Sequence, residues 1–297
     1  MKRRVLMFVV SLLVAGCALP SFAADLMLGA KAGYFVWDPY IKEFKGTFIS
    51  DMDRGSGFLY GPVMSVSFSP DVTFSVSGLF GEQSTHWYSP DQLTTVGGGG
   101  QYYISGTYYV EMERIDVDSA LSFRLTEKMK VFAGYKYQRG LLEMYSTERR
   151  YDPLGGDDKV YDSYMKIDIP AHGPALGLGV SQPLGSQFFA AANLSGLYMF
   201  NRGKMKEQRY KEYSTADGLE FTGNIEYGTP ISLKAEQIGF NFEPSVGGLF
   251  DSAGTVATLG ARLQYTWIRF NNPEDVMPDG WSPDIQYGVY LTVLYSF

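Results

Sequence analysis

The C-terminal stretch of the chain, residues 285–297, reads IQYGVYLTVLYSF. Every odd position from Ile285 to Phe297 is apolar or aromatic, whereas the even positions include Gln286, Thr292 and Ser296. Successive side chains of a β-strand point to opposite faces, so the stretch predicts a strand with one continuously apolar face. Such a face is typical of a strand that contacts lipid between two aromatic girdles, although the terminal strand of a soluble sandwich also alternates.

The same alternation recurs along the chain and predicts ten strands. They cover residues 26–37, 57–68, 72–88, 101–125, 129–147, 163–182, 187–202, 229–250, 255–270 and 284–297. Four connections are short, at 69–71, 126–128, 183–186 and 251–254. Five are long and polar, at 38–56, 89–100, 148–162, 203–228 and 271–283. Short turns on one side and long loops on the other predict an all-β fold, a transmembrane antiparallel up-and-down β-barrel.

The expected strand number is ten, with eight and twelve as alternatives. Twelve strands would require segment 203–228 to cross the membrane, with Thr215–Gly218 as a turn. The Lys, Glu and Arg content of that segment argues against lipid exposure, since a Lys or Arg on the lipid face costs roughly 2–4 kcal/mol at the midplane. The segment is therefore expected to lengthen the seventh and eighth strands.

The composition excludes two broad classes of protein. Aromatic residues make up 15% of the 297 residues and charged residues 19%, compared with about 25% charged residues in ordinary soluble domains. So much aromatic surface cannot remain solvated, which excludes a disordered chain. A helical membrane protein is also excluded. After the first 20 residues no apolar run approaches the ~20 residues of a membrane-spanning helix, and the mean hydropathy is −0.11.

The N-terminus has the features of an export signal. Lys2, Arg3 and Arg4 precede an apolar stretch of 15 residues, from 5 to 19. Cleavage after Ala23 would leave a barrel domain of residues 24–297 without cysteine, which suits export through an oxidising compartment. The alternative is a lipoprotein signal, residues 13–17, with Cys17 lipidated.

The two faces of the predicted strands differ in character. The proposed lipid face includes Val72, Phe74, Val76, Phe80, Ile115, Val117, Leu121, Phe123, Leu176, Leu178, Val180, Leu259, Leu263, Tyr265 and Trp267. The opposite face carries Ser65, Ser67, Thr73, Ser75, Ser77, Gly173, Ala175, Gly177, Gly179, Asn193 and Ser195. A soluble barrel fills its inside with bulky aliphatic side chains, so the small and polar inner face predicts the inverted pattern of a membrane barrel.

Seven charged residues fall on the inward face. They are Lys31, Arg114, Asp116, Asp118, Lys136, Glu243 and Arg262. The short turns place Asp118 opposite Lys136 and Glu243 opposite Arg262, and cross-strand pairs of opposite charge are stabilising. We interpret the set as a salt-bridged network that fills a narrow barrel; a charged constriction of a small pore is the alternative.

The expected size of the barrel bears on that alternative. Ten strands lie near the small, side-chain-filled end of the range, so a general porin is not expected. The small inward residues of the sixth strand, 171–179, could still leave a void for a water file or a narrow channel.

The end of the chain also carries a resemblance. A terminal Phe297 with apolar residues at each second position before it, including Tyr295, resembles the signal by which bacterial outer-membrane barrels are recognised by their assembly machinery. Over its mature length the chain is similar in architecture to bacterial outer-membrane β-barrels of eight to ten strands, including the opacity-type proteins. The resemblance implies an integral outer-membrane location.

Two enzyme families share this architecture, and the chain departs from both. Omptin proteases need an Asp pair and an Asp-x-His arrangement, but Ser84 and Pro170 stand two residues before His86 and His172. Lipid A deacylases use His-x-Ser, where this chain has Tyr88 after His86 and Pro174 after His172. No catalytic residues are therefore assigned, both histidines are expected to have no chemical role, and no enzyme activity is expected.

Basic residues in the third and fourth long loops are candidates for contact with lipopolysaccharide phosphates. They are Arg149, Arg150, Arg202, Lys204, Lys206 and Arg209. The alternative is that these basic side chains are simply solvated where the loops begin and bind no lipid. Tyrosines such as Tyr108, Tyr145 and Tyr164 indicate hairpins that rise above the membrane and present surface to partners. Gly97–Gly100 is interpreted as the tip of a loop. Asp152, Asp157 and Asp158 are interpreted as solvated loop carboxylates, with calcium binding as the less favoured alternative.

The sequence thus predicts a non-enzymatic outer-membrane barrel that acts structurally or by surface recognition through its outer loops. A narrow channel for small solutes is the alternative, and a surface hydrolase is less favoured. The expected partners are outer-membrane lipid or lipopolysaccharide, the barrel assembly machinery and an extracellular ligand. No cofactor, metal or nucleic acid is expected.

Overall fold

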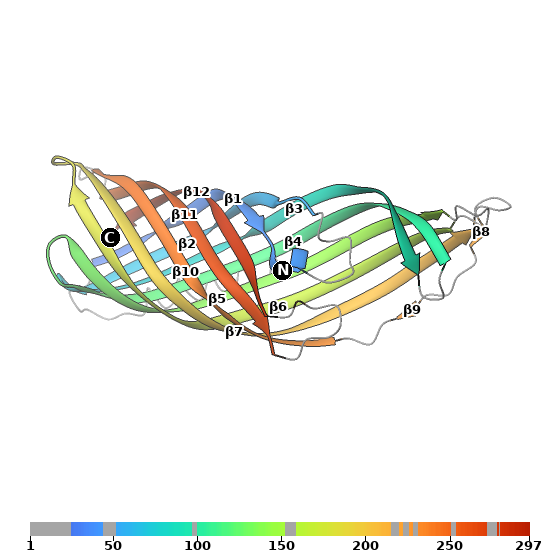
Figure 1. The fold of residues 1–297 in the computed structure, drawn as a ribbon. Coiled ribbons are helices and arrows are strands. Elements are labelled where there is room, and N and C mark those ends of the chain that lie inside the picture. The colour runs from blue at the N-terminus through green and yellow to red at the C-terminus, as the bar shows by residue number, and fades with distance from the viewer. Residues whose placement is uncertain are drawn as a thin grey trace.

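The computed structural model describes residues 25–43, 52–96, 100–151, 159–214, 220–221, 226–227, 231–250, 254–271, 278 and 280–297. Ten long strands in this part of the chain close into one antiparallel barrel (Figure 1). They are β1 Asp25–Asp38, β2 Gly55–Ser69, β3 Val72–Val96, β4 Gly100–Arg124, β5 Met129–Tyr151, β6 Lys159–Pro183, β7 Phe188–Ser214, β10 Ile231–Phe250, β11 Thr255–Phe270 and β12 Trp281–Ser296. The prediction of ten strands is confirmed.

The barrel closes through two pairings that the chain order alone does not supply. β12 pairs with β1, and β7 pairs with β10. Between β7 and β10 lie two two-residue strands, β8 Glu220–Phe221 and β9 Glu226–Tyr227, which pair with the outer part of β7. Full closure removes the exposed strand edges that an open sheet would present.

Two predicted loops are partly strand. β3 continues to Val96 and β4 begins at Gly100, so most of predicted loop 89–100 is a hairpin, and β7 continues to Ser214. The sequences of these extensions, PDQLTTV at 90–96 and GKMKEQRYKEYS at 203–214, lack the apolar alternation on which the strand prediction depended. Residues 97–99, the centre of the predicted glycine tip, lie outside the described residues.

Five neighbouring strands are much taller than the rest. β3 to β7 have 23–27 residues, whereas β1, β2, β11 and β12 have 14–16. Figure 1 shows β3 to β7 projecting beyond the other strands at the end opposite the short turns. The barrel therefore has a ring of ten strands and a one-sided extension of five.

An exposed apolar band surrounds the ring. Outward side chains such as Leu176, Leu259 and Val289 expose 69%, 58% and 58% of their surface. Apolar exposure on this scale around a closed barrel is that of a transmembrane strand surface. Within the described residues, no helix is both long and apolar enough to cross a membrane.

The apolar face changes sides along β5. In the ring, Lys136 and Gln138 point inward and Tyr135 points outward. In the extension, Leu142 and Met144 are buried on the inward side, while the outward residues include Glu143 and Tyr145. Lipid surrounds the ring and water surrounds the extension, so the hydrophobic effect selects opposite faces on the two sides of this switch.

An apolar core consequently fills the outer end of the ring and the inward side of the extension. Its buried members are Trp37, Tyr40, Ile41, Met52, Trp87, Tyr108, Val110, Met112, Leu142, Met144, Met165, Ile167, Met205, Leu233, Ala235, Ile268 and Phe270. The prediction of a polar lumen is therefore wrong for the outer half and right for only part of the ring, where an inward apolar cluster of Phe35, Leu59, Leu79 and Tyr290 accompanies the polar residues. Alternation reveals an apolar face but not the side of the sheet on which water lies.

Candidate functional site

All seven inward charged residues named from the sequence lie in one connected network in the ring. They are Lys31, Arg114, Asp116, Asp118, Lys136, Glu243 and Arg262, contributed by β1, β4, β5, β10 and β11. The register places Asp118 opposite Lys136, as predicted, with Nζ 2.7 Å from Oδ1. β10 and β11 pair with residue numbers that sum to 505 on both sides of Glu243 (242 and 263, 245 and 260), so Glu243 faces Arg262.

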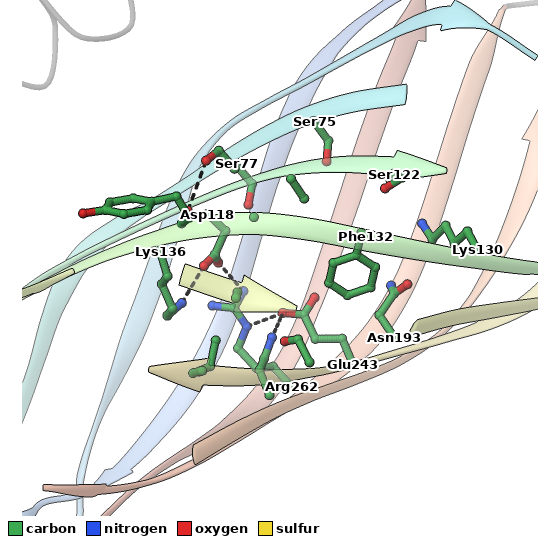
Figure 2. A pocket seen from close by; sticks show the side chains of 18 residues that line it. Ser75, Ser77, Asp118, Ser122, Lys130, Phe132, Lys136, Asn193, Glu243 and Arg262 are labelled. Atoms are coloured by element: carbon green, nitrogen blue, oxygen red, sulfur yellow. Dashed lines mark hydrogen bonds and ion pairs between the residues drawn. The ribbon is translucent and has the colours of Figure 1, made fainter. Parts of the chain in front are cut away.

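Arg262 is the centre of this network. Its Nε donates a hydrogen bond of 2.5 Å to Glu243, and its Nη2 donates one of 2.8 Å to Asp118. Its Nη1 lies 3.7 Å from Oδ2 of Asp116. Because β11 and β4 lie on opposite walls, the guanidinium joins the two sides of the barrel across the lumen. The dashed lines of Figure 2 trace the contacts that Arg262 makes with Asp118 and Glu243.

Two further cations complete the network. Lys31 Nζ lies 3.2 Å from Oε2 of Glu243 and 3.7 Å from the centroid of the Tyr290 ring, a cation–π distance. Arg114 Nε donates a hydrogen bond of 3.1 Å to Asp116. Four cations thus share three carboxylates, so each of the seven charges has a partner of opposite sign and the layer keeps one formal positive charge in excess.

A polar vestibule lies between this network and the short turns. A cavity of about 160 Å³ is bounded by the network and by Ser75, Ser122, Lys130 and Asn193 (Figure 2). A second cavity of about 330 Å³ shares these four residues and extends to the turn residues 126–128. The vestibule is therefore open at the short-turn end and meets the charged network at its inner end.

An amide layer that the sequence analysis missed covers the outer side of the network. Its buried members include Gln83, Gln138, Gln237, Gln264 and Gln286. Gln264 donates a hydrogen bond of 3.1 Å to Gln138 across the lumen, and Gln237 donates one of 2.6 Å to the Thr266 hydroxyl. Their inward position could be read from the sequence, since they alternate with outward apolar residues, but only Gln286 was named there and no layer of amides was predicted.

The described part of the first outer connection packs into the outer end of the barrel. The 3-10 helix η1, Tyr40–Glu43, directly follows β1 and buries Tyr40 and Ile41 in the apolar core. Trp37 Nε1 donates a hydrogen bond of 2.8 Å to Asp284, so the end of β1 is anchored to β12 beneath the helix. Burial and the nearby charge of Asp284 raise the pKa of the Tyr40 hydroxyl, which therefore stays neutral. We call η1 and the buried Met52 the plug.

Cavities follow the small inward residues of β6, as expected from the sequence. Gly179 and Ala175 line the two vestibule cavities, and Ala171 lines a third cavity of about 60 Å³ between the amide layer and the apolar core. Gly173 stands between them, and its register partner Lys136 is held by Asp118. The charged network therefore interrupts the file of cavities.

The two histidines lie apart on the outer surface. His86 pairs in register with Tyr109, which pairs with Tyr145, whereas His172 pairs with Tyr137. The two positions are therefore eight residues apart along β5, or roughly 27 Å of strand rise. His172 Nδ1 lies 2.6 Å from the Tyr135 hydroxyl oxygen.

The basic residues named as lipid contacts do not all point outward. Arg149 does, and Arg202, Lys204 and Lys206 follow one another on the outward face of β7. Arg150 lies on the inward face, where its guanidinium sits 4.5 Å from the centroid of the Tyr161 ring, because it is one strand position from Arg149. The prediction for Arg150 is therefore wrong. The side chain of Arg209 lies outside the described residues.

The remaining predicted residues fall into two groups. Tyr295 and Phe297 are exposed on the lipid face with ring centroids 4.9 Å apart. Residues 1–24, including Cys17 and the cleavage site after Ala23, lie outside the described residues, as do Asp152, Asp157 and Asp158. In the part that the structure describes, no three His, Cys, Asp or Glu side chains are grouped to hold a metal ion.

No protein-family model and no curated sequence matches the chain. Among solved structures, the outer membrane protease OmpT from Escherichia coli is similar at 12% identity, with a TM-score of 0.44, covering 94% of this chain and 99% of that chain. The translocator domain of the autotransporter NalP from Neisseria meningitidis is similar at 10% identity, with a TM-score of 0.33 and coverages of 99% and 96%. A major outer membrane protein from Thermus thermophilus gives 12% identity, a TM-score of 0.28 and coverages of 93% and 100%.

Proposed function

We propose that this chain is an integral protein of a bacterial outer membrane, exported by a cleaved signal peptide, that acts without catalysis through its projecting hairpins. The observation that carries the proposal is the inversion along β3 to β7. Above the apolar band these strands turn apolar side chains inward, onto a core that they share with η1 and the outer ends of β1, β10 and β11, and turn polar and tyrosine side chains outward. They form a platform that projects beyond the apolar band, which is the arrangement expected of a recognition surface.

The lumen supports a role outside the barrel rather than through it. Three successive layers cross it: the charged network around Arg262, the amide layer and the plug. We therefore expect the purified protein to show no steady conductance in planar lipid bilayers. A stable single-channel current from the unmodified protein would contradict this sealed-barrel proposal.

Recognition by the platform can be tested by comparing the adhesion of cells that display the whole protein with that of cells that display a shortened variant. Cells that display the whole protein should adhere to an immobilised surface ligand, whereas cells that display a variant with residues 90–102 and 152–158 replaced by short Gly-Ser turns should not. The variant keeps the ring and the network, so heat-dependent migration on a denaturing gel should be unchanged. Equal adherence of both cell types across a panel of immobilised glycans and extracellular proteins would count against recognition through these hairpin tips.

A narrow channel is the second candidate, and the file of cavities along β6 favours it. In this alternative the plug is a removable seal and the charged network sets ion selectivity. Replacing residues 39–54 by a short Gly-Ser turn should then produce a current, and Glu243→Gln in that background should change its cation-to-anion selectivity. Absence of current in the plug-deleted protein would remove the channel from consideration.

A surface hydrolase is the third class and the least favoured. The two histidines are separated along β5, and neither has the sequence context of the two barrel enzyme families considered above. Incubation of the purified protein with peptides and with lipid A should give no turnover. Hydrolysis that is abolished by His86→Ala would overturn the non-enzymatic proposal.

A further inference from the structure

We propose that Arg202, Lys204 and Lys234 form a binding site for the phosphate groups of a phosphorylated lipid in the outer leaflet. These three residues, the cation triad, lie on the outward faces of β7 and β10 just above the apolar band. The inference rests on the proposed outer-membrane location and adds a specific ligand chemistry and position to it. Lys234 was not among the residues named from the sequence.

The triad opposes like charges across neighbouring strands. The register pairs Arg202 directly with Lys234, and Lys204 follows Arg202 on the same face of β7. Directly opposed side chains of this kind have Cβ atoms about 5 Å apart, and like charges in that position are destabilising. All three side chains are exposed, so the repulsion persists unless an anion lies between them.

The nearest carboxylates are already occupied. Asp168 lies opposite Lys204 in the register, but its two oxygens accept hydrogen bonds of 2.7 and 2.6 Å from Arg139. Glu236, two residues from Lys234, accepts a hydrogen bond of 3.0 Å from Arg269. Among the described residues, no carboxylate forms an ion pair with a member of the triad.

Other outward cations close to the upper edge of the band do have partners. Arg139 binds Asp168, Arg269 binds Glu236, Lys166 binds Glu143 and Arg54 binds Asp38. Each of these four cations thus has a carboxylate partner, whereas the cation triad has none among the described residues. A multivalent anion such as a phosphate ester would neutralise it by charge-assisted hydrogen bonds, with the Arg202 guanidinium as a planar fork.

The surface below the triad favours a lipid over free phosphate. Phe200, Tyr198 and Ile238 are exposed on the same two strands and lie on the membrane side of Arg202. Leu194 and Phe242 continue this apolar strip towards the short turns. A ligand with a phosphorylated headgroup and several acyl chains would match the cations and the strip together, because lipid phosphates lie immediately outside the hydrocarbon.

Binding is tested on purified full-length protein in detergent, independently of conductance. Native mass spectrometry would measure the affinity for three probes: lipid A with both phosphates, the same lipid with both phosphates removed, and inorganic phosphate. The variant Arg202→Gln/Lys204→Gln/Lys234→Gln should bind diphosphorylated lipid A on the order of 100-fold more weakly, from roughly a factor of five for each cation. The control Arg124→Gln/Lys128→Gln/Lys130→Gln removes the same charge at the short-turn end and should bind like the unmodified protein.

Each result decides the proposal. Selective loss in the triad variant, with weak binding of the dephosphorylated lipid, supports the proposed site. Equal affinity of the triad variant and the unmodified protein overturns it. Inorganic phosphate that binds as tightly as the lipid identifies an anion site and overturns the lipid assignment. Heat-dependent gel migration verifies that both variants are folded, and none of these outcomes depends on whether the lumen conducts.

Discussion

Arg262 on β11 donates a hydrogen bond of 2.8 Å to Asp118 on β4, across the full width of the lumen. The two residues are 144 positions apart in the sequence, and four strands lie between β4 and β11 in either direction around the barrel. No hairpin turn joins their two strands, so their contact does not follow from local register. This contact converts two local cross-strand pairs, Asp118–Lys136 and Glu243–Arg262, into one layer that spans the barrel.

Removal of the central guanidinium should be the most damaging single change in the ring. Arg262→Gln leaves Asp118, Glu243 and Asp116 without their shared cation, and breaking a buried ion pair costs about 3–5 kcal/mol. Urea-driven unfolding in lipid vesicles measures this loss. Arg269 lies on β11, like Arg262, and Arg269→Gln breaks an exposed pair with Glu236 of β10, which should cost less than about 1 kcal/mol. Equal losses for the two variants would show that the network does not stabilise the ring.

The position of the membrane can be tested by introducing an arginine either in the apolar band or on the outward face of the extension. Leu176→Arg places a cation in the exposed apolar band and should lower the free energy of unfolding by roughly 2–4 kcal/mol. Tyr109→Arg places it on the outward face of the extension, where water solvates it, and should change stability by less than about 1 kcal/mol. A large loss at position 109 would mean that lipid reaches the extension.

Truncation of apolar side chains should have opposite consequences inside and outside the sheet. Leu142→Ala opens a cavity in the apolar core of the extension and should cost about 2–4 kcal/mol. Hydrogen exchange should then accelerate in the tall hairpins before it does in the ring. Leu178→Ala, on the lipid face of β6, leaves no internal cavity and should leave exchange in the hairpins unchanged. Slow exchange in the hairpins of the Leu142 variant would contradict the presence of a packed core there.

Two glycines on neighbouring strands should respond differently to alanine. A Cβ at Gly173 would lie 2.0 Å from the Tyr198 carbonyl oxygen, so Gly173→Ala must push β6 and β7 apart and should cost about 1–3 kcal/mol. A Cβ at Gly196 would meet nothing within 4 Å, and Gly196→Ala should be neutral or stabilising by several tenths of a kcal/mol. Thermal unfolding of the two variants gives the comparison, and a reversed order would contradict the close approach of these strands.

Much of the candidate site could be predicted because short turns transmit register. The turn at 126–128 placed Asp118 opposite Lys136 from residue numbers alone, and the turn at 251–254 did the same for Glu243 and Arg262. No such rule connects β1 to β12 or β7 to β10. The contact of Lys31 with Glu243 and the opposition of Arg202 and Lys234 therefore could not be predicted.

The plug was equally hidden from the sequence. Tyr40 and Ile41 belong to a connection predicted as a polar loop, and their burial depends on core residues contributed by strands far along the chain, from β3 to β11. Arg150 shows the reverse error, since loop membership was read as outward exposure while strand parity turned the side chain inward.

By itself, the sequence determined that ten alternating strands exist, which residues share a face and which turns are short, because side-chain direction in a strand depends only on position along the chain. Only the tertiary structure decided which residues meet across the lumen and where the apolar face changes from outside to inside. Those outcomes depend on how the barrel closes and on whether lipid or water surrounds a given part of each strand. The alternation of residues carries no information on either.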